Sequence, residues 1–562
     1  MALGEPGPPV GEDKGVGMTA IDPSAARKAR GAFFTPPELC RYVVDWALRG
    51  PSDVLLEPSC GEAAFLVAAA RRLAELGGRA DERQLHGVEM HAASASGART
   101  RLASAAAAAK IRVADFFTLD PTPRYDAVVG NPPYVRYQDF TGQARVRSQA
   151  AALRAGVSLS GLASSWAAFT VHAALFLKPG GRLGLVLPAE LLSVNYAAGV
   201  RRFLMTRFKS VRLVLFTERV FPGVMEEVVL LLADGFDRGP TGHCELFQAT
   251  NLSDLHSAVG RRWVPPTPGH KWTASLLPDT AQAAVAAITG FTELETWGDT
   301  TLGMVTGNNR YFALSPEEIA EKELPPDELI PLSPPGSRHL RGLAFTSAAW
   351  RDLGAQGRAT HLFRPPGDPS EPARLYIKAG EQVGIDNAYK CRVRTPWWRV
   401  PLVPPAHLLL TYMNADTPRL CANRARVHHL NSVHGLYLRS GYVKTGLDLL
   451  PVAALNAMTL LGAEVVGRAY GGGMLKLEPK EADKLPVPAK DLLLAARDEL
   501  LALQPRVAEA LRTGSVTDAA ALVDEVLLVR HLGLRRKDLT ALRSAHADLH
   551  GRRVARGAGA RM

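Results

Sequence analysis

Short apolar segments alternate with longer helical patterns from about residue 38 to about residue 235. Segments 53–57 and 84–89 have the composition of buried strands, and 62–76 between them has apolar residues at helical spacing. A chain that alternates strands with helices forms a mostly parallel sheet, because each helix carries the chain back across it. We therefore predict an α/β, Rossmann-like domain over 25–240. Ligands of such sheets bind at the carboxyl ends of the strands.

The pattern changes on both sides of this domain. Residues 1–24 are rich in Gly and Pro, which predicts a disordered lead. After 240, repeated proline-rich breaks interrupt short and irregular patterns, which predicts a mixed α+β domain over 245–490. Helical spacing returns over 491–562, where we predict C-terminal helices and a basic tail.

Composition narrows the class of protein. Hydrophobic residues make up 47% of the 562 residues and charged residues 22%, which excludes a largely disordered chain. Neither a membrane-length apolar run nor a secretory signal is present in the sequence, and five scattered cysteines exclude a disulfide scaffold or a CxxC zinc module. We expect a cytoplasmic protein with no metal and no membrane partner. The net charge of +11 favours a polyanion as partner.

The strongest local signal is Asn131-Pro132-Pro133-Tyr134, which directly follows the strand pattern YDAVVG. Two prolines make the loop rigid and remove backbone donors, so carbonyls are free to point outward. The Asn131 side-chain oxygen and the Pro132 carbonyl can together accept both hydrogens of an exocyclic amine. Tyr134 offers a face on which a flat base can stack, worth about 1–3 kcal/mol. A plain Pro-Pro turn explains the same residues without any function.

A second signal is VLLEPSCGEAAF over 54–65. The strand ends in Glu57-Pro58, and Gly61 opens a helix, so backbone amides at the helix start can approach a ligand closely. An ordinary turn between a strand and a helix has the same pattern.

Acidic residues also end the next two strands. Glu89 is placed to accept hydrogen bonds from ribose hydroxyls, and Asp115 is placed to accept one from an adenine amino group, with Phe116 packing on the ring. A solvated acid and a strand cap beside a core phenylalanine are the plainer interpretations. Thr35 precedes two prolines and reads as an N-cap with proline at N1.

The order of these signals resembles the S-adenosylmethionine-dependent adenine-N6 DNA methyltransferases. Cofactor motifs come first, NPPY next and a target-recognition region last, which looks like the gamma class and its TaqI-like type II restriction–modification methylases. The resemblance covers about 25–235. It implies a class I methyltransferase domain, S-adenosylmethionine as cofactor, double-stranded DNA as substrate and an adenine flipped out of the helix.

The resemblance also implies a role for each matching residue. Asn131, Pro132, Pro133 and Tyr134 would be catalytic, and Phe221 would be the second aromatic that stacks on the flipped base. The cofactor would contact Thr35, Glu57, Pro58, Gly61, Glu89, Asp115 and Phe116. One position departs from the family pattern, because Ala63 stands where a second glycine is frequent.

The second half carries weaker signals. Segments 304–314, 431–438 and 470–488 look like pieces of target-recognition domains. Cations and aromatics alternate between them, which suits contact with phosphates and base edges. The candidate DNA-binding residues are Arg392, Arg394, Trp397, Trp398, Arg399, Arg424 and Arg426. A basic solvated surface over core tryptophans is the alternative. The tail 530–562 either clamps DNA or is a solvated charged end, and we favour the solvated end.

Other functions fit parts of the pattern. NPPY also resembles the motif of glutamine methyltransferases and of some RNA base methyltransferases, and the same cradle fits the N4 amine of cytosine. A fused restriction–modification enzyme lacks support, because no nuclease motif stands in a strand context, so a separately encoded endonuclease or other defence protein is the expected partner. A catalytically inactive DNA-binding component is the alternative from a different class.

Overall fold

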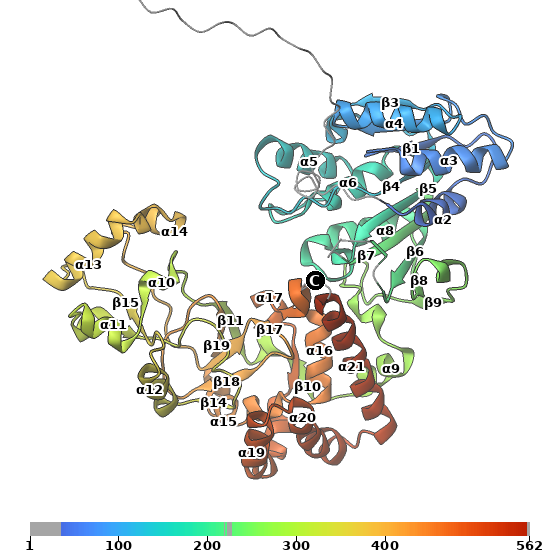
Figure 1. The fold of residues 1–562 in the computed structure, drawn as a ribbon. Helices are drawn as coiled ribbons and strands as arrows, with labels where there is room; N and C mark the ends of the chain where they lie inside the picture. Colours follow the sequence, from blue (N-terminus) through green and yellow to red (C-terminus); the bar gives the residue numbers. More distant parts are fainter. Residues whose placement is uncertain (1–34, 219, 222–226, 559–562) are drawn as a thin grey trace, which may run out of the picture. The chain divides into compact units, whose positions relative to one another are not determined.

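The computed structural model describes residues 35–218, 220–221 and 227–558, in two compact units (Figure 1). One unit comprises residues 35–187, 207–209 and 230–239. The other comprises 188–206, the described part of 210–229, and 240–558. The predicted lead 1–24 and the segment 31–34 ahead of Thr35 lie outside the described residues.

A mostly parallel sheet is built from the first strands of the chain, which confirms the predicted α/β class. Its order is β3-β2-β1-β4-β5-β7-β6-β8-β9. Strand β1 pairs in parallel with β2 and β4, β2 with β3, and β4 with β5. The strands are β1 (Leu55–Glu57), β2 (Leu85–Glu89), β3 (Lys110–Val113), β4 (Tyr125–Gly130), β5 (Leu177–Pro188), β6 (Phe208–Phe216), β7 (Val228–Phe236), β8 (Cys244–Ala249) and β9 (Gly260–Trp263).

Helices lie on both sides of these strands. Figure 1 shows α2 and α3 on one side of β1, β4 and β5, and α5 and α6 on the other. Gly184 lets α2 approach β5, since a Cβ there would lie 2.7 Å from Val43 Cγ1. The helices of this part of the chain are α2 (Pro37–Ala47), α3 (Ala64–Glu75), α4 (Ala92–Ser104), the short 3-10 helix η1 (Phe116–Thr118), α5 (Gly142–Arg154), α6 (Ser165–Ala174), α7 (Glu190–Ser193) and α8 (Ala198–Arg207).

The strand order reverses between β1 and β4. From β1 the chain proceeds outward to β2 and β3, and it then returns to place β4 on the other side of β1. Sheets of this kind bind ligands in the crevice outside the strand ends at such a switch point. Glu57 ends β1 and Asn131 follows β4. A Cβ on Gly130 would lie 3.8 Å from Glu57 Cγ, so the two strand ends are neighbours.

The second unit combines small sheets, largely antiparallel, with short helices. A five-stranded sheet has the order β11-β19-β16-β18-β14, and smaller sheets have the orders β12-β15-β13, β17-β21-β20 and β10-β22. The strands are β10 (Phe291–Glu293), β11 (Gly298–Leu302), β12 (Ala313–Leu314), β13 (Leu329–Pro331), β14 (Ala344–Phe345), β15 (His361–Phe363), β16 (Leu408–Thr411), β17 (Met413–Asn414), β18 (Leu420–Asn423), β19 (Val433–Leu438), β20 (Arg468–Tyr470), β21 (Met474–Lys476) and β22 (Pro486–Pro488).

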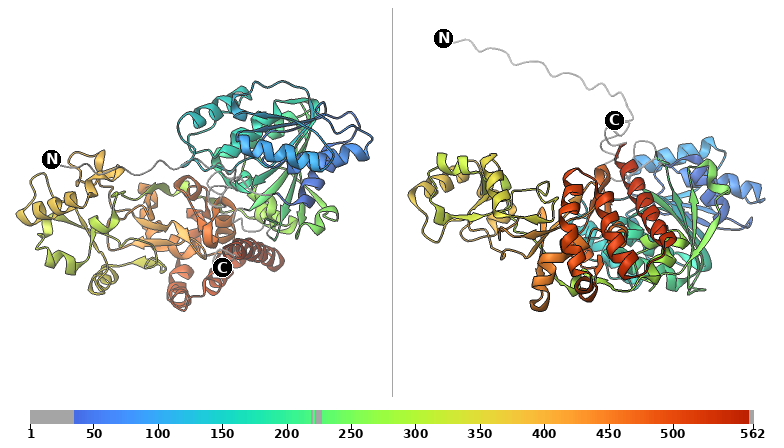
Figure 2. Two further views of the ribbon diagram at one scale, coloured as in Figure 1. Left: turned by 45° about the horizontal axis from the view of Figure 1, so that its top comes forward. Right: turned by 90° about the horizontal axis from the view of Figure 1, so that it is seen from below.

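Helices close the chain, as the sequence predicts (Figure 2). The helices of this half are α9 (Asp279–Ala287), α10 (Asn309–Phe312), α11 (Pro316–Glu321), α12 (Ser347–Ala355), α13 (Glu371–Gln382), α14 (Tyr389–Arg392), α15 (Val443–Ala453), α16 (Ala457–Val466), α17 (Pro479–Ala482), α18 (Lys490–Ala495), α19 (Arg497–Arg512), α20 (Val516–Asp524), the π-helix η10 (Glu525–His531) and α21 (Arg536–Ala558).

The basic tail is not simply a solvated end. Arg553 of α21 is 2% exposed, and its guanidinium lies 2.7 Å from Glu464 of α16. Arg543 of the same helix pairs with Asp524 at 2.8 Å. Burial of one face of α21 therefore recruits part of the tail's charge into structural ion pairs, which corrects the expectation of a solvated tail.

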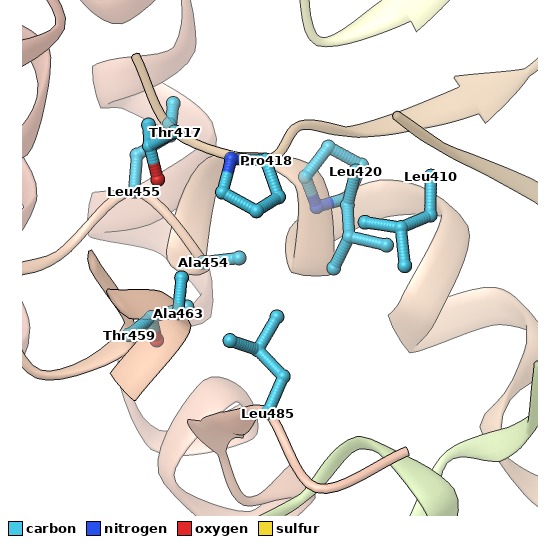
Figure 3. A pocket seen from close by; sticks show the side chains of 10 residues that line it. Leu410, Thr417, Pro418, Leu420, Ala454, Leu455, Thr459, Ala463 and Leu485 are labelled. Carbon is cyan, nitrogen blue, oxygen red and sulfur yellow. The ribbon is translucent and has the colours of Figure 1, made fainter. Parts of the chain in front are cut away.

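The second unit holds a small pocket of about 10 Å³ (Figure 3). Leu410, Leu420 and Leu485 are among the side chains that line it. A volume of roughly 10–15 Å³ is the least that holds one water, so this pocket has no room for a larger ligand. Among the described helices, none alone is long and apolar enough to cross a membrane; the bent pair Ser440–Ala453 and Ala457–Val466 meets the length and composition test only together.

Candidate functional site

The centre of the site is the loop that follows β4. Tyr134 Oη lies 2.8 Å from Asn131 Oδ1 and 2.9 Å from the Val186 carbonyl oxygen of β5, within donating distance of both. Asn131 Nδ2 donates to Thr35 Oγ1 at 3.1 Å. The amide of Asn131 is therefore held at both ends, with its nitrogen toward Thr35 and its oxygen toward Tyr134.

The first residue of α6 forms hydrogen bonds with the backbone of the loop that holds the two prolines. Ser165, the first residue of that helix, donates its hydroxyl to the Pro133 carbonyl and accepts a hydrogen bond from Val135 N at 2.9 Å. Ser165 engages the carbonyl of Pro133, and the carbonyl expected to serve a substrate is that of Pro132. Sequence reasoning does not single out Ser165, although a serine at a helix start is a common backbone partner.

The loop between β1 and α3 is folded onto two carboxylates. Glu57 Oε2 accepts from Leu66 N at 3.0 Å in the first turn of α3. Glu89, at the end of β2, accepts from Gly61 N and from His91 N, each at 2.9 Å. Both carboxylates point inward, because Glu57 is 2% and Glu89 7% exposed. The amide of Gly61 thus joins the predicted loop after β1 to the predicted acid, Glu89, at the end of β2.

Burial also changes the pKa of Glu57. Loss of water raises the pKa of this carboxyl well above its ordinary value, although amide hydrogen bonds from Leu66 and Phe65 oppose the shift. The negative charge of Glu89 adds to the increase. A buried carboxyl with a raised pKa at a strand end is the kind of group that active sites contain.

Asp115 and Phe116 lie at the end of β3. Asp115 caps η1 by accepting from Phe117 N at 3.0 Å, and its other oxygen lies 3.3 Å from Arg147 of α5. The ring of Phe116 packs on Phe169 of α6, with ring centres 4.8 Å apart, and is 4% exposed. The strand cap and the core phenylalanine are therefore both present, and a role for either residue at a cofactor adenine stays a prediction.

The prediction that Thr35 caps α2 is wrong. The helix begins at Pro37, and Pro36 is its N-cap, with φ −55° and ψ 138°. The Pro36 carbonyl accepts from Leu39 N and Cys40 N at 3.1 Å each. Two consecutive prolines move the helix start one residue along, which leaves the buried hydroxyl of Thr35 to Asn131.

Phe221 belongs to the second unit. The residue is buried, and residues 222–226 after it lie outside the described part of the chain. Its stacking on a flipped base stays a prediction.

The candidate DNA-binding residues fall into two groups. Arg392, Arg399, Arg424 and Arg426 are exposed, although Arg424 pairs with Asp448 at 2.6 Å. Arg394, by contrast, donates to the carbonyls of Thr306 and Val305.

The two tryptophans contact other side chains of the second unit. Trp397 Nε1 donates to Glu381 at 3.0 Å, and its ring centre lies 5.6 Å from that of Tyr311. Trp398 packs edge-on against Trp397, with ring centres 6.0 Å apart. Both tryptophans are half-buried against the core, and Arg394 bonds to backbone carbonyls, so these three residues have structural contacts. A role in DNA binding stays a prediction for all seven candidate residues.

Comparison with known proteins found a matching family model for each half of the chain. Residues 22–253 match the N-6 DNA Methylase family model, and residues 269–528 match the model of the C-terminal domain of the Type II methyltransferase M.Eco57I. The Type II methyltransferase M.XamI of Xanthomonas campestris pv. amaranthicola is 27% identical over 488 residues, which are 84% of this chain and 88% of that protein. M.AccI of Acinetobacter calcoaceticus is 22% identical over 489 residues, 82% of this chain and 85% of that protein.

A solved structure resembles the chain as a whole. The Type IIL restriction–modification enzyme MmeI, solved in complex with DNA, matches with a TM-score of 0.53 at 12% identity, over 92% of this chain and 75% of that one. This likeness concerns the fold alone.

The mostly parallel sheet with helices on both sides is the fold of a class I S-adenosylmethionine-dependent methyltransferase. Within that class, the family match and the Type II relatives narrow the assignment. The chain is an adenine-specific DNA methyltransferase of the restriction–modification kind.

Proposed function

We propose that Asn131 and the Pro132 carbonyl hold the N6 amine of an adenine that has left the DNA helix, in the manner of the gamma-class enzymes. The observation that carries this proposal is the fixed amide of Asn131 at the switch point of the sheet, with its oxygen held by Tyr134. The lone pair of an adenine amine is delocalised into the ring. An acceptor that orients the amine hydrogens favours the tetrahedral, nucleophilic form, and its contribution comes from positioning and electrostatics.

The residues around β1 and β2 fit S-adenosylmethionine. Gly61 has φ +47°, and a Cβ added there would meet nothing within 4 Å, so the loop leaves open space beside the strand ends. Glu89 has carboxylate oxygens of the kind that ribose hydroxyls donate to, and Glu57 has a buried carboxyl beside them. When bound, the cofactor supplies a methyl group already activated by its sulfonium.

We assign the remaining roles by position. Asp115 accepts from the adenine amino group of the cofactor, and Tyr134 stacks on the flipped base. Flipping costs a few kcal/mol of unstacking, which this stacking offsets. The second unit reads double-stranded DNA through its exposed arginines. A separately encoded restriction endonuclease or other defence protein recognises the same target, and the enzyme acts in the bacterial cytoplasm on the nucleoid.

Nucleoside mass spectrometry tests this proposal. The protein is incubated with S-adenosylmethionine and either unmethylated plasmid DNA or total RNA, and the modified nucleosides are identified. N6-methyladenine in DNA alone supports the proposal. N4-methylcytosine would move the reaction to another base, and a methylated base in RNA would change the substrate. DNA binding without cofactor binding in calorimetry would identify an inactive binding component.

A further inference from the structure

The Asn131 amide is held between two hydroxyl groups from distant parts of the chain. Thr35 precedes α2 and accepts from Nδ2 at 3.1 Å, and Tyr134 Oη lies 2.8 Å from Oδ1. Tyr134 Oη also lies 2.9 Å from the Val186 carbonyl, and Val186 is fully buried in β5. The backbone of β5, the central strand of the sheet, thus holds the Tyr134 hydroxyl in place beside the amide.

An asparagine without such partners is a poor catalytic acceptor. Half a turn about its last side-chain bond exchanges the oxygen for the nitrogen, which would present N–H donors to an amine that is itself a donor. A buried polar group that loses its partner is costly, so two hydroxyls bonded to opposite ends of the amide hold it in place. Each hydroxyl can both donate and accept, and in the observed pairing the nitrogen faces Thr35 and the oxygen faces Tyr134. Thr35 is 5% exposed, which keeps water from replacing it easily.

We propose that Thr35 and the hydroxyl of Tyr134 are positioning residues that hold the Asn131 amide in place for the target amine. This inference rests on the proposed function and deepens it. It assigns the Thr35 side chain to the amide of Asn131, whereas the family resemblance implies that Thr35 contacts the cofactor. It also gives Tyr134 a second role, because its hydroxyl positions the amide in addition to the proposed stacking of its ring.

The first test separates positioning from cofactor binding. Thr35→Val keeps the shape of the side chain and removes the hydroxyl, and Thr35→Ser restores the hydroxyl. We expect Thr35→Val to lower kcat about tenfold, because the amide then loses one of its two anchors. The dissociation constant of S-adenosylmethionine from calorimetry should stay within about twofold, and Thr35→Ser should recover most of kcat. A weakened affinity for the cofactor with unchanged kcat would overturn the inference.

A double-variant cycle supplies a second readout. Tyr134→Phe keeps the ring and removes the hydroxyl, and we expect it to lower kcat about tenfold as well. Because both hydroxyls act on one amide, the double variant should lose clearly less than the product of the two single losses. Losses that multiply would show that the hydroxyls act independently, against the inference. If the wild-type protein forms no N6-methyladenine, the proposed function fails first; if it is active and Thr35→Val matches it, only this inference fails.

Discussion

Ala63 occupies a backbone conformation that favours glycine. It precedes α3 with φ 63° and ψ 35°, in the left-handed region. An L-residue in that region costs about 1–2 kcal/mol relative to right-handed backbone. Replacing Ala63 by glycine removes this cost, but it also adds freedom to the unfolded chain, about 0.5–1 kcal/mol, and loses a buried methyl worth about 0.8 kcal/mol. We therefore expect Ala63→Gly to be nearly neutral for the free energy of unfolding.

A matched control isolates the backbone cost. Ala68 lies inside α3 with ordinary helical geometry, and glycine there costs about 1 kcal/mol. Ala63→Gly should therefore be less destabilising than Ala68→Gly by about 1 kcal/mol, which corresponds to roughly 2–4 °C in Tm for a domain of this size. Calorimetric or fluorescence melts of both variants measure the difference. Equal losses at the two positions would refute the left-handed conformation of the loop.

Further expectations follow from the same contacts. Burial raises the pKa of Glu57, so keeping this carboxyl ionised lowers the free energy of unfolding as pH rises above the ordinary pKa of glutamate. Glu57→Gln should therefore unfold at a higher urea concentration than wild type at pH about 8, and this gain in stability should shrink toward pH about 5. Glu89→Gln should weaken S-adenosylmethionine binding roughly 10–100-fold in calorimetry, since hydrogen bonds to a charged group contribute about 1.5–3 kcal/mol. The control Asp120→Asn, at a side chain that is 91% exposed, should leave the dissociation constant unchanged. Arg392→Ala should reduce the salt dependence of DNA binding by about one ion, while Arg394→Ala should lower Tm instead, because the Arg394 guanidinium binds backbone carbonyls; the reverse pattern would contradict the division of the arginines.

The sequence predicts the catalytic half of the fold well because its signals are local. Strand β1 ends at Glu57, β2 ends at Glu89 and Asp115 follows β3, and a parallel sheet brings such ends to one edge. The Asn131 motif likewise follows its strand directly, so its place at the switch point could be predicted. The helix α5 was missed, and with it Arg147, which pairs with Asp115.

The other misses concern contacts between distant segments. Asn131 and Thr35 are 96 positions apart, and Arg553 and Glu464 are 89 apart, so neither pairing leaves a trace in local sequence. The residue type of Thr35 and the prolines after it fit a helix cap locally, but the N-cap of α2 is Pro36. The left-handed backbone of Ala63 had a sequence signal, since glycine is frequent at that position of the family pattern.

The rate of N6-methyladenine formation by Asn131→Ala, at saturating S-adenosylmethionine and DNA, tests the central claim most directly. Removing a preorganised group of this kind costs about 10²–10³ in rate, so the variant should be at least about a hundredfold slower than wild type. Calorimetry on the same preparation should show the cofactor still bound, because the side chain of Asn131 bonds to Thr35 and Tyr134, whereas the proposed cofactor residues Glu57 and Glu89 bond to the amides of their own loop. A rate within about threefold of wild type would contradict the account.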